Sequence, residues 1–298
     1  DKKLKKLAEE IDIYARVNPI DKVRILNALK NNNIIAMTGD GVNDAPALKD
    51  ADIGISVNDS TDVAKEASNI VLLDNSFTSI VKAVKEGRGI YNNIKKFVNY
   101  LLSSNLGEIF VLLFAMLIGF KDNLGNFIIP LLPLQILWIN LITDGLPALA
   151  LGIDPVNKSV MHKHPRNPKE NLISKNMIYN ILFTGLIFAV STLFLFNLNL
   201  NNPVKAQTIA FTTLVVLELL RVNLIRKQYN AGLFENKYLI LAILASFFLQ
   251  LLVIYSPLKN LFQTISLNLY DWMLILSISI ISSILCWLFY KISIKITK

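Results

Sequence analysis

The sequence predicts a small α/β domain with a parallel sheet, followed by an all-α domain of six membrane-crossing helices. Short apolar runs alternate with helical patterns over residues 1–90, which is typical of a parallel α/β sheet. Six long apolar segments follow within residues 91–298. The composition agrees with this division, because 53% of the residues are hydrophobic, only 17% are charged and the mean hydropathy is +0.47.

The first 90 residues contain the runs from which we expect a sheet to form. The expected strands lie at 11–15, 34–37, 53–57 and 70–72, and the expected helices at 19–31, 43–49 and 62–67. Because a sheet of this size is small, we expect part of the domain to lie outside the chain. The sequence also begins Asp1-Lys2-Lys3-Leu4 without an initiator methionine, so we interpret it as a piece of a longer protein.

The apolar segments are each long enough, or nearly so, for the ~20 residues that a helix needs to cross a bilayer. They lie at 97–119, 128–150, 177–197, 206–223, 238–256 and 270–290. The alternative, core helices of a large soluble protein, would require polar faces that these runs lack. We also expect one helix to run from about Phe77 toward Gly119, with Gly87 and Gly89 as the positions where it could be interrupted.

The distribution of charge predicts how the chain is oriented. The net charge is +8, but the basic residues form no stripe with interleaved aromatic residues, so we expect no nucleic-acid partner. They gather in the loops at 152–175 and 221–237 and in the C-terminal tail, whereas the other loops carry one lysine each. By the positive-inside rule, the N-terminal domain, the basic loops and the C-terminus are predicted to be cytoplasmic in a multi-pass protein surrounded by lipid.

A glycine-rich turn in the first domain carries two acidic residues. Asp40 lies between Gly39 and Gly41, directly after an expected strand, and Asp44 opens the next helix. This order places both carboxylates at the C-terminal edge of a parallel sheet, where α/β proteins bind ligands. Flanking glycines let the backbone approach a phosphate, and carboxylate oxygens suit Mg²⁺. The alternative is a turn whose Asp and Asn residues cap the next helix.

Polar and acidic residues also interrupt the apolar segments. Asn105 and Glu108 share one helix face in the first segment, and Glu218 lies in the fourth. Ionisable residues at membrane depth indicate a functional site. The alternative is hydrogen bonding between helices, with Glu218 paired to Arg221.

The second apolar segment carries three such residues. Asn140, Thr143 and Asp144 have the i, i+3, i+4 spacing of one helix face. We expect the following Gly145-Leu146-Pro147 to loosen the helix and free backbone carbonyls. With the carboxylates of the other segments, the set is rich in oxygen and suited to Ca²⁺. It contains no soft ligands, which argues against copper or zinc.

The chain resembles a known family on these motifs. The string Thr38-Gly39-Asp40-Gly41-Val42-Asn43-Asp44-Ala45-Pro46 resembles the hinge motif of P-type ATPases. The phosphorylation domain of that family has a haloacid-dehalogenase-like (Rossmann-like) α/β fold. The string Ala15-Arg16-Val17-Asn18-Pro19-Ile20-Asp21-Lys22 resembles the family segment whose lysine contacts the phosphate. The resemblance implies that Asp40 binds Mg²⁺, that Asn43 and Asp44 support the phosphoryl site and that Lys22 contacts the phosphate.

The membrane segments resemble those of one branch of the family. The strings at 101–108 and 135–148 resemble helices five and six of sarco/endoplasmic-reticulum-type calcium pumps, and Val216-Leu217-Glu218 lies where helix eight supplies a glutamate. Residues 91–298 then correspond to membrane helices five to ten of the family. The implied Ca²⁺ ligands are Asn105, Glu108, Thr143, Asp144 and Glu218 for one site, and Asn140 and Asp144 for the other. Sodium-potassium pumps have Asp at the position that matches Asn140. Plasma-membrane and secretory-pathway calcium pumps have Met at the position that matches Thr143 and lack the glutamate that matches Glu108.

The resemblance implies ATP-driven Ca²⁺ transport through an aspartyl-phosphate cycle that uses Mg²⁺ and ATP. The family's Asp-Lys-Thr-Gly-Thr nucleophile string does not occur in the sequence. We therefore expect the chain to be inactive alone and to need an N-terminal half with the nucleotide and actuator domains and the first four membrane helices. The alternatives are a non-enzymatic subunit of a split pump, a pump for another cation such as Mn²⁺, or a free-standing phosphatase. The short loop at 198–205 favours a bacterium-like plasma-membrane pump.

Overall fold

The computed structural model describes the chain except for residues 1, 9, 31–32, 123–124, 163, 167–169, 233 and 297–298. Within these limits the chain divides into two compact units. The first contains residues 1–86 and 164–170, and the second contains residues 87–163 and 171–298. The predicted helix end at Asn31 and three of the loop and tail charges, Lys163, Lys169 and Lys298, lie outside the described residues.

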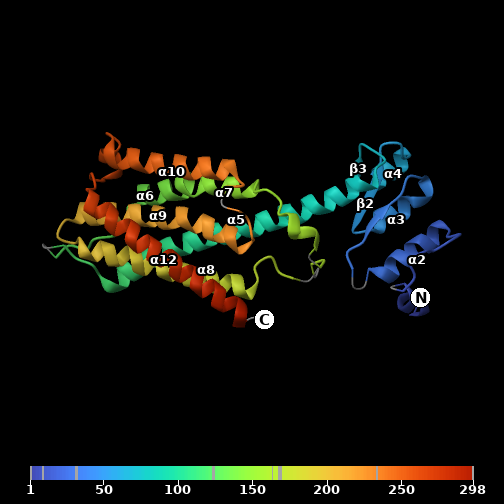
Figure 1. Ribbon diagram of the computed structural model, residues 1–298, viewed down its shortest axis with the longest axis horizontal. Helices are drawn as coiled ribbons and strands as arrows, with labels where there is room; N and C mark the ends of the chain where they lie inside the picture. The colour runs from blue at the N-terminus through green and yellow to red at the C-terminus, as the bar shows by residue number, and fades with distance from the viewer. Residues whose placement is uncertain are drawn as a thin grey trace. The chain divides into compact units, whose positions relative to one another are not determined.

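The first unit contains a three-stranded, fully parallel sheet, as predicted. Its order is β1 (Ala36–Thr38), β2 (Ile53–Val57) and β3 (Ile70–Leu72), with Ala36 paired to Ile53 and Ile55 paired to Ile70. Helices lie between and before the strands (Figure 1). They are α1 (Lys2–Leu7), α2 (Pro19–Leu29), the 3₁₀ turn η1 (Val42–Asp44), α3 (Ala45–Asp50) and α4 (Asp62–Ala67).

Side-chain caps fix where these helices begin. The side-chain oxygen of Asn18 accepts a hydrogen bond from the Asp21 amide at 2.8 Å, and Pro19 occupies the first helical position of α2, where its missing N–H costs nothing. The hydroxyl of Thr61 caps α4 by accepting from the Ala64 amide at 3.4 Å. Both helices begin at the residues expected from the sequence, Pro19 and Asp62.

One predicted strand is wrong. Residues 11–15 form no strand, and the side chains of Ile11 and Ile13 are 38% and 83% exposed. A strand needs a neighbour for its backbone hydrogen bonds, and no strand of the described sheet pairs with this run. Its apolar residues therefore lie at the surface of the described unit.

The second unit is helical, and its described residues contain six helices that are long and apolar enough to cross a membrane, as predicted. Five are continuous, and the second is formed by three consecutive segments, α6, η2 and α7. The helices are α5 (Phe77–Ile118, which begins in the first unit), α6 (Pro133–Trp138), the π-helix η2 (Ile139–Thr143), α7 (Gly145–Gly152), the 3₁₀ turn η3 (Lys158–His162), α8 (Lys175–Leu198), α9 (Pro203–Gln228), α10 (Lys237–Tyr255), the short α11 (Lys259–Phe262) and α12 (Leu269–Ile296).

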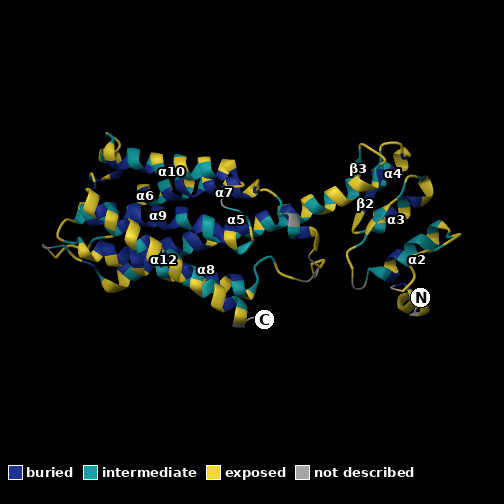
Figure 2. Ribbon diagram, viewed as in Figure 1, coloured by how far each residue is buried: buried dark blue, intermediate teal, exposed yellow. Residues whose placement is uncertain are grey.

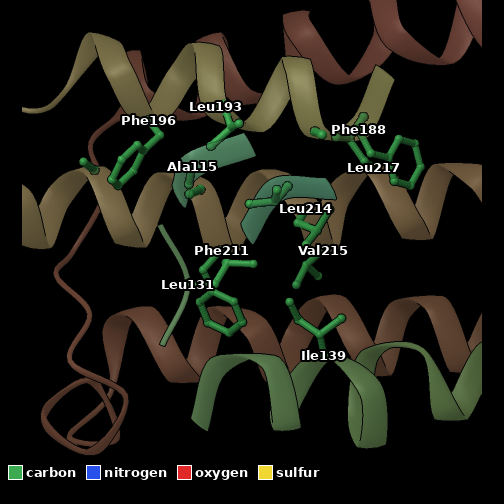
Figure 3. Packing of buried hydrophobic residues seen from close by; sticks show 14 of the residues in the cluster. Ala115, Leu131, Ile139, Phe188, Leu193, Phe196, Phe211, Leu214, Val215 and Leu217 are labelled. Carbon is green, nitrogen blue, oxygen red and sulfur yellow. The ribbon is translucent and has the colours of Figure 1, made fainter. Parts of the chain in front are cut away.

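Helix α9 is the central helix of this unit. In its most apolar 18-residue stretch 83% of the residues are buried, against 22% for α12, and Figure 2 shows exposed faces on α10 and α12. Helices α8, α9 and α12 pack side by side. Figure 3 shows Phe211, Leu214 and Val215 of α9 within the main apolar cluster, with Ile139 of η2 facing them. The core thus holds η2 against α9, which carries Glu218.

The possible interruption of α5 at its glycines is not found, because the helix is continuous through Gly87 and Gly89. Gly89 serves close packing instead. A Cβ added to Gly89 would lie 2.2 Å from a methyl carbon of Val156, so any larger residue would have to displace the Val156 side chain from α5.

The predicted loosening at Gly145-Leu146-Pro147 is not found, because α7 is α-helical from Gly145 onward, and the irregular turn of this segment lies one turn earlier. The π-helix η2 ends at Thr143, before Gly145 and Pro147, and the amide of Asp144 bonds to the carbonyl of Ile139, five residues back. A π-helix within an α-helix often marks a functional site. Here it contains or adjoins the polar residues that the sequence singles out in this segment.

Candidate functional site

In the first unit, an ion pair joins α2 to the glycine-rich turn after β1. The ammonium group of Lys22 contacts Oδ1 of Asp44, whose other oxygen accepts a 3.4 Å hydrogen bond from the Gly41 amide. Asp44 is buried. The structure therefore brings together two of the four predicted phosphate-site residues at the C-terminal end of a parallel strand.

The close approach of Asp44 requires the glycine before Asp40. A Cβ built on Gly39 would lie 2.5 Å from Cβ of Asp44, which is too short for two carbon atoms. At Gly41 the nearest atom of Asp44 would lie 3.8 Å away. The first glycine of the motif is thus a packing requirement for seating Asp44.

Charge and hydrogen bonds set the protonation state of Asp44. Its burial acts to raise the pKa, but the hydrogen bond and charge of Lys22, together with the backbone amides of Gly41 and Asp40, outweigh burial and lower the pKa below its ordinary value. Asp44 is therefore an anion at neutral pH and holds Lys22 in place.

Asp40 and Asn43 lie in the same turn with exposed side chains. The backbone carbonyl of Asp40 accepts a hydrogen bond from the Thr61 amide at 2.9 Å, which ties the turn to the start of α4. An exposed carboxylate on a backbone fixed in this way is available to a ligand. No side-chain hydrogen bond joins Asp40 or Asn43 to Lys22 among the described residues.

In the second unit, the structure joins two predicted ligands directly. The side-chain amide of Asn140 donates to both carboxylate oxygens of Glu108, at 3.1 and 2.8 Å, and also to the Ile136 carbonyl at 3.1 Å. Hydrogen bonding between helices, one of the alternatives raised by the sequence, is thus what the structure shows for this pair.

Asp144 and Glu218 are both fully buried beside this pair. The hydroxyl of Tyr100 donates to Oδ1 of Asp144 at 2.7 Å. Oδ2 of Asp144 and both carboxylate oxygens of Glu218 have no hydrogen-bond partner among the described residues, and Glu218 lies within electrostatic range of both Asp144 and Glu108. Buried oxygens without a hydrogen-bond partner lower the stability of the fold unless a ligand or a proton binds them.

The alternative pairing of Glu218 with Arg221 is not seen in the described structure. Arg221 is buried and donates to Oδ1 of Asn99 at 3.4 Å, while the oxygens of Glu218 remain without partners there. The two charged groups therefore do not neutralise one another through a hydrogen bond.

The structure does not bring all the predicted ligands together. Asn105 is half-buried one turn before Glu108, and no hydrogen bond joins it to the three carboxylates in the described part of the chain. The Thr143 hydroxyl bonds to the Ile139 carbonyl at 3.1 Å. Among the described residues, no group of three or more His, Cys, Asp or Glu side chains lies close enough to hold a metal ion.

A buried charge cluster around Asp154 was not found from the sequence. Asp154 follows α7 and contacts the Lys96 ammonium group at 2.5 Å and Nε of Arg226 at 3.0 Å. Asn236 donates to Oδ1 of Asp154 at 3.0 Å, and Asn93 donates to its carbonyl at 2.7 Å. The available signal was a single charge placed just beyond an apolar segment, which resembles an ordinary loop residue.

Six membrane-length helices that bury ionisable side chains between them define the class of the molecule. It is an integral membrane protein with polar and charged groups in its core, as transport proteins have. Residues 128–292 match the family model described as "Cation transporting ATPase, C-terminus". Because that match covers more than half of the chain, the chain belongs to the cation-transporting P-type ATPase family.

Similar curated proteins agree with this assignment. The "Calcium-transporting ATPase" of Bacillus subtilis is 46% identical over 95% of this chain and 32% of its own length. "Calcium-transporting ATPase 1" of Bacillus cereus is 42% identical over 92% of the chain and 33% of its own length. The human "Calcium-transporting ATPase type 2C member 1" is 40% identical over 93% of the chain and 30% of its own length. The chain thus spans about a third of the length of these relatives.

Proposed function

We propose that this chain is the C-terminal part of an ATP-driven Ca²⁺ pump of the sarco/endoplasmic-reticulum type, acting through an aspartyl-phosphate cycle. The observation that carries the proposal is the set of orphaned carboxylate oxygens on Asp144 and Glu218 in the membrane core. The names of the bacterial and type 2C relatives, which describe calcium-transporting ATPases, support the same cargo.

The cation would be held by oxygen atoms from three membrane helices. Asp144 and Glu218 supply the orphaned oxygens, and the hydroxyl of Ser104 in α5 is also buried without a partner among the described residues. Hard oxygen ligands of this kind suit Ca²⁺, which takes six to eight of them. The type of ligand atom therefore fits Ca²⁺, although these side chains do not surround a single point in the structure.

Binding of the ion would require Asn140 to turn over. Its amide nitrogen now faces Glu108, so a half-turn of the carboxamide would present Oδ1 to the ion and release the Glu108 carboxylate. Asn105 and Thr143 complete the proposed set from positions adjoining Glu108 and Asp144 on α5 and η2. The assignment to the sarco/endoplasmic-reticulum type rests on Glu108 and Thr143.

In the first unit, Lys22, Asp40, Asn43 and Asp44 would serve phosphoryl transfer in a haloacid-dehalogenase-like domain. The ion pair with Asp44 holds the Lys22 ammonium group at the C-terminal end of β1, where its charge can stabilise a phosphoryl group. The exposed carboxylate of Asp40 would hold Mg²⁺, which neutralises phosphate charge when bound. The parallel order β1-β2-β3 supports this fold assignment.

The proposed setting of the chain follows from its loop charges. Basic residues at 152–175 and 221–237 favour a cytoplasmic first unit and C-terminus, in the plasma membrane of a bacterium-like cell. An upstream half would supply ATP binding, the phosphorylated aspartate and further membrane helices.

The test is ATP-dependent ⁴⁵Ca²⁺ uptake into vesicles by the chain joined to its upstream half. We expect Glu108→Gln and Asp144→Asn each to abolish uptake, while the surface variant Asp12→Asn transports normally. If the pump transports Mn²⁺ but not Ca²⁺, the proposed cargo is wrong. If both membrane variants still take up Ca²⁺, the proposed cation site is wrong. An upstream half encoded as a separate chain would favour the alternative of a split-pump subunit.

A further inference from the structure

Helix α10 carries two polar side chains, one turn apart, inside the second unit. Ser246 and Gln250 have the i, i+4 spacing of one helix face, and both are fully buried. Helix α10 packs along η2 and α7 (Figure 1). Neither residue is a cation ligand in the proposed function, so the reason for burying polar groups at these two positions lies elsewhere.

Gln250 contacts the residue that directly precedes η2. The indole N–H of Trp138 donates to the side-chain oxygen of Gln250 at 3.2 Å. The ring of Trp138 also packs edge-on against that of Phe262 in α11, with 5.0 Å between the ring centres. One turn earlier, the side-chain amide of Gln135 donates to the Phe262 carbonyl at 3.0 Å. Side-chain contacts therefore tie the beginning of the π-helix to α10 and α11.

Ser246 contacts the other end of η2. Its hydroxyl donates to the backbone carbonyl of Thr143, the last residue of the π-helix, at 3.5 Å, and this is the longer and weaker of the two bonds. The two side chains of α10 thus bracket the five residues of η2. Because π-helical turns are rare and occur mostly inside longer α-helices at functional sites, contacts at both ends indicate that α10 selects this form.

The amide group of Gln250 lowers the stability of the fold as well as supporting a contact. Its nitrogen is buried without a hydrogen-bond partner among the described residues, and an unsatisfied buried donor costs free energy. Methionine is similarly long and unbranched and would leave no such donor. What glutamine supplies and methionine lacks is the oxygen that accepts from the Trp138 indole.

We propose that Gln250, assisted by Ser246, is a positioning residue that holds η2 in its π-helical form and so fixes the ligands that this segment supplies to the cation. The inference rests on the proposed function, in which Asn140 and Asp144 bind the transported ion. Asn140 lies within η2 and Asp144 directly follows it, so releasing either end of η2 displaces both side chains. Loss of the α10 contacts weakens cation binding and leaves the later steps of transport unaffected.

The test is the cation dependence of uptake into vesicles by the chain joined to its upstream half. We expect Gln250→Met to weaken the apparent Ca²⁺ affinity about fivefold, the effect of one hydrogen bond between neutral groups, at an unchanged maximal rate. Thermal unfolding of the same preparations in a calcium chelator should match the wild type, because the orphaned amide is removed together with the bond. A purely structural role would lower stability and maximal rate along with the affinity.

A double-mutant cycle tests the hydrogen bond itself. Trp138→Phe removes the donor, and Gln250→Met removes the acceptor. Because both substitutions act on one bond, the variant that carries both should bind the cation no more weakly than the weaker of the two single variants.

Two further variants complete the set. Ser246→Ala should weaken the affinity less, by about twofold, in keeping with its longer bond. Gln207→Met is the matched control, because the Gln207 amide also donates to another segment, at the Ile129 carbonyl at 2.9 Å, but that carbonyl lies before α6 begins. The control should keep the wild-type affinity and maximal rate.

Wild-type affinity in both Gln250→Met and Trp138→Phe would overturn the proposal. Additive losses in the double variant, or a parallel fall in affinity, maximal rate and stability, would overturn it as well. Asp144→Asn, run in the same assay, separates this inference from the proposed function. If Asp144→Asn abolishes uptake while the α10 variants behave as the wild type, only the positioning role is wrong.

If Asp144→Asn transports normally, the proposed cation site is wrong and the positioning role is wrong with it. If the pump moves Mn²⁺ in place of Ca²⁺, the affinities are compared with Mn²⁺, so a wrong cargo leaves the test of the α10 contacts intact.

Discussion

The side-chain amide of Asn140 spans both carboxylate oxygens of Glu108 and so fastens η2 to α5 inside the membrane unit. Both hydrogen bonds go to one acidic group, and Glu108 is buried. Replacing Asn140 would therefore remove both hydrogen bonds at once and leave the buried Glu108 carboxylate without its amide partner.

We expect Asn140→Leu to destabilise the chain by about 1–3 kcal/mol, because the Glu108 carboxylate would lose its donor. Unfolding of the chain in mixed micelles, in buffer with a calcium chelator, measures the difference. Asn105→Leu is the matched control, since Asn105 is half-buried on the same helix as Glu108 without such a bond in the described structure. Equal losses for the two variants would contradict the assignment of the contact.

The hydrogen bond from Tyr100 to Asp144 predicts a role for a phenol in cation affinity. Tyr100→Phe keeps the ring in its buried position but removes the 2.7 Å bond that orients the carboxylate. In the reconstituted pump we expect the apparent Ca²⁺ affinity to fall about tenfold, the equivalent of one hydrogen bond to a charged group. Tyr179→Phe, which alters an exposed ring, should leave the calcium dependence of uptake unchanged.

The two glycines of the turn after β1 should respond differently to one methyl group. Gly39→Ala forces a carbon to within 2.5 Å of Cβ of Asp44, so we expect a loss of about 1–3 kcal/mol and displacement of Asp44 from Lys22. Gly41→Ala meets nothing closer than 3.8 Å and should cost less than about 1 kcal/mol. Limited proteolysis of the first unit ranks the variants, and a reversed order would refute the packing argument.

The lowered pKa of Asp44 predicts a pH window for the ion pair with Lys22. A carboxyl group whose folded pKa lies below its unfolded value, about 3.9, stabilises the fold above that value. This contribution disappears as the pH falls through the folded pKa. Hydrogen-exchange protection of α2 should therefore be greater in the wild type than in Asp44→Asn at neutral pH, and the difference should vanish in strong acid.

Asp12→Asn, which changes an exposed carboxyl group of the same unit, controls for general effects of charge on hydrogen exchange. A difference between the wild type and Asp44→Asn that persists undiminished below the folded pKa would show that the carboxylate charge is not its cause.

Asp154→Asn should be strongly destabilising. The substitution leaves the buried cations Lys96 and Arg226 facing a neutral amide, and breaking a buried pair from one side costs about 3–5 kcal/mol. Adding Lys96→Met should restore part of the stability, because one buried charge is then removed. Lys205→Met removes the part-exposed partner of the buried Asp271 and should cost less than Asp154→Asn, because the Asn268 amide still donates to the Asp271 carboxylate. Micelle unfolding of the wild type and these variants provides the comparison.

The sequence was most informative where a local rule decides the structure. Apolar length and composition located the six membrane-length helices of the described chain, and the helix expected at 19–31 begins where α2 begins. The run at 11–15 was misread because apolar residues form a strand only where a neighbour is available, and a neighbour is a property of the whole fold. Gly89 was read as a possible break because nothing local reveals that Val156 packs against it.

The candidate cation site shows a similar limit. The i, i+3, i+4 rule that grouped Asn140, Thr143 and Asp144 assumes α-helical geometry, whereas these residues lie in or directly after a π-helix. The hydroxyl of Thr143 bonds to the Ile139 carbonyl of its own segment. Tyr100, which donates to Asp144, carries no charge in the sequence and could be found only once α5 was placed beside η2.

In the described part of the chain, the buried cations Lys96 and Arg226 both contact the carboxylate of Asp154, in surroundings that screen charge poorly. A divalent cation that approached along this end of α7, α9 and α10 would meet a fixed repulsive potential. In a calcium pump of the kind proposed, the positive charges of this cluster would prevent Ca²⁺ from passing it. The ion would then have to reach Asp144 and Glu218 by a route that avoids Lys96 and Arg226.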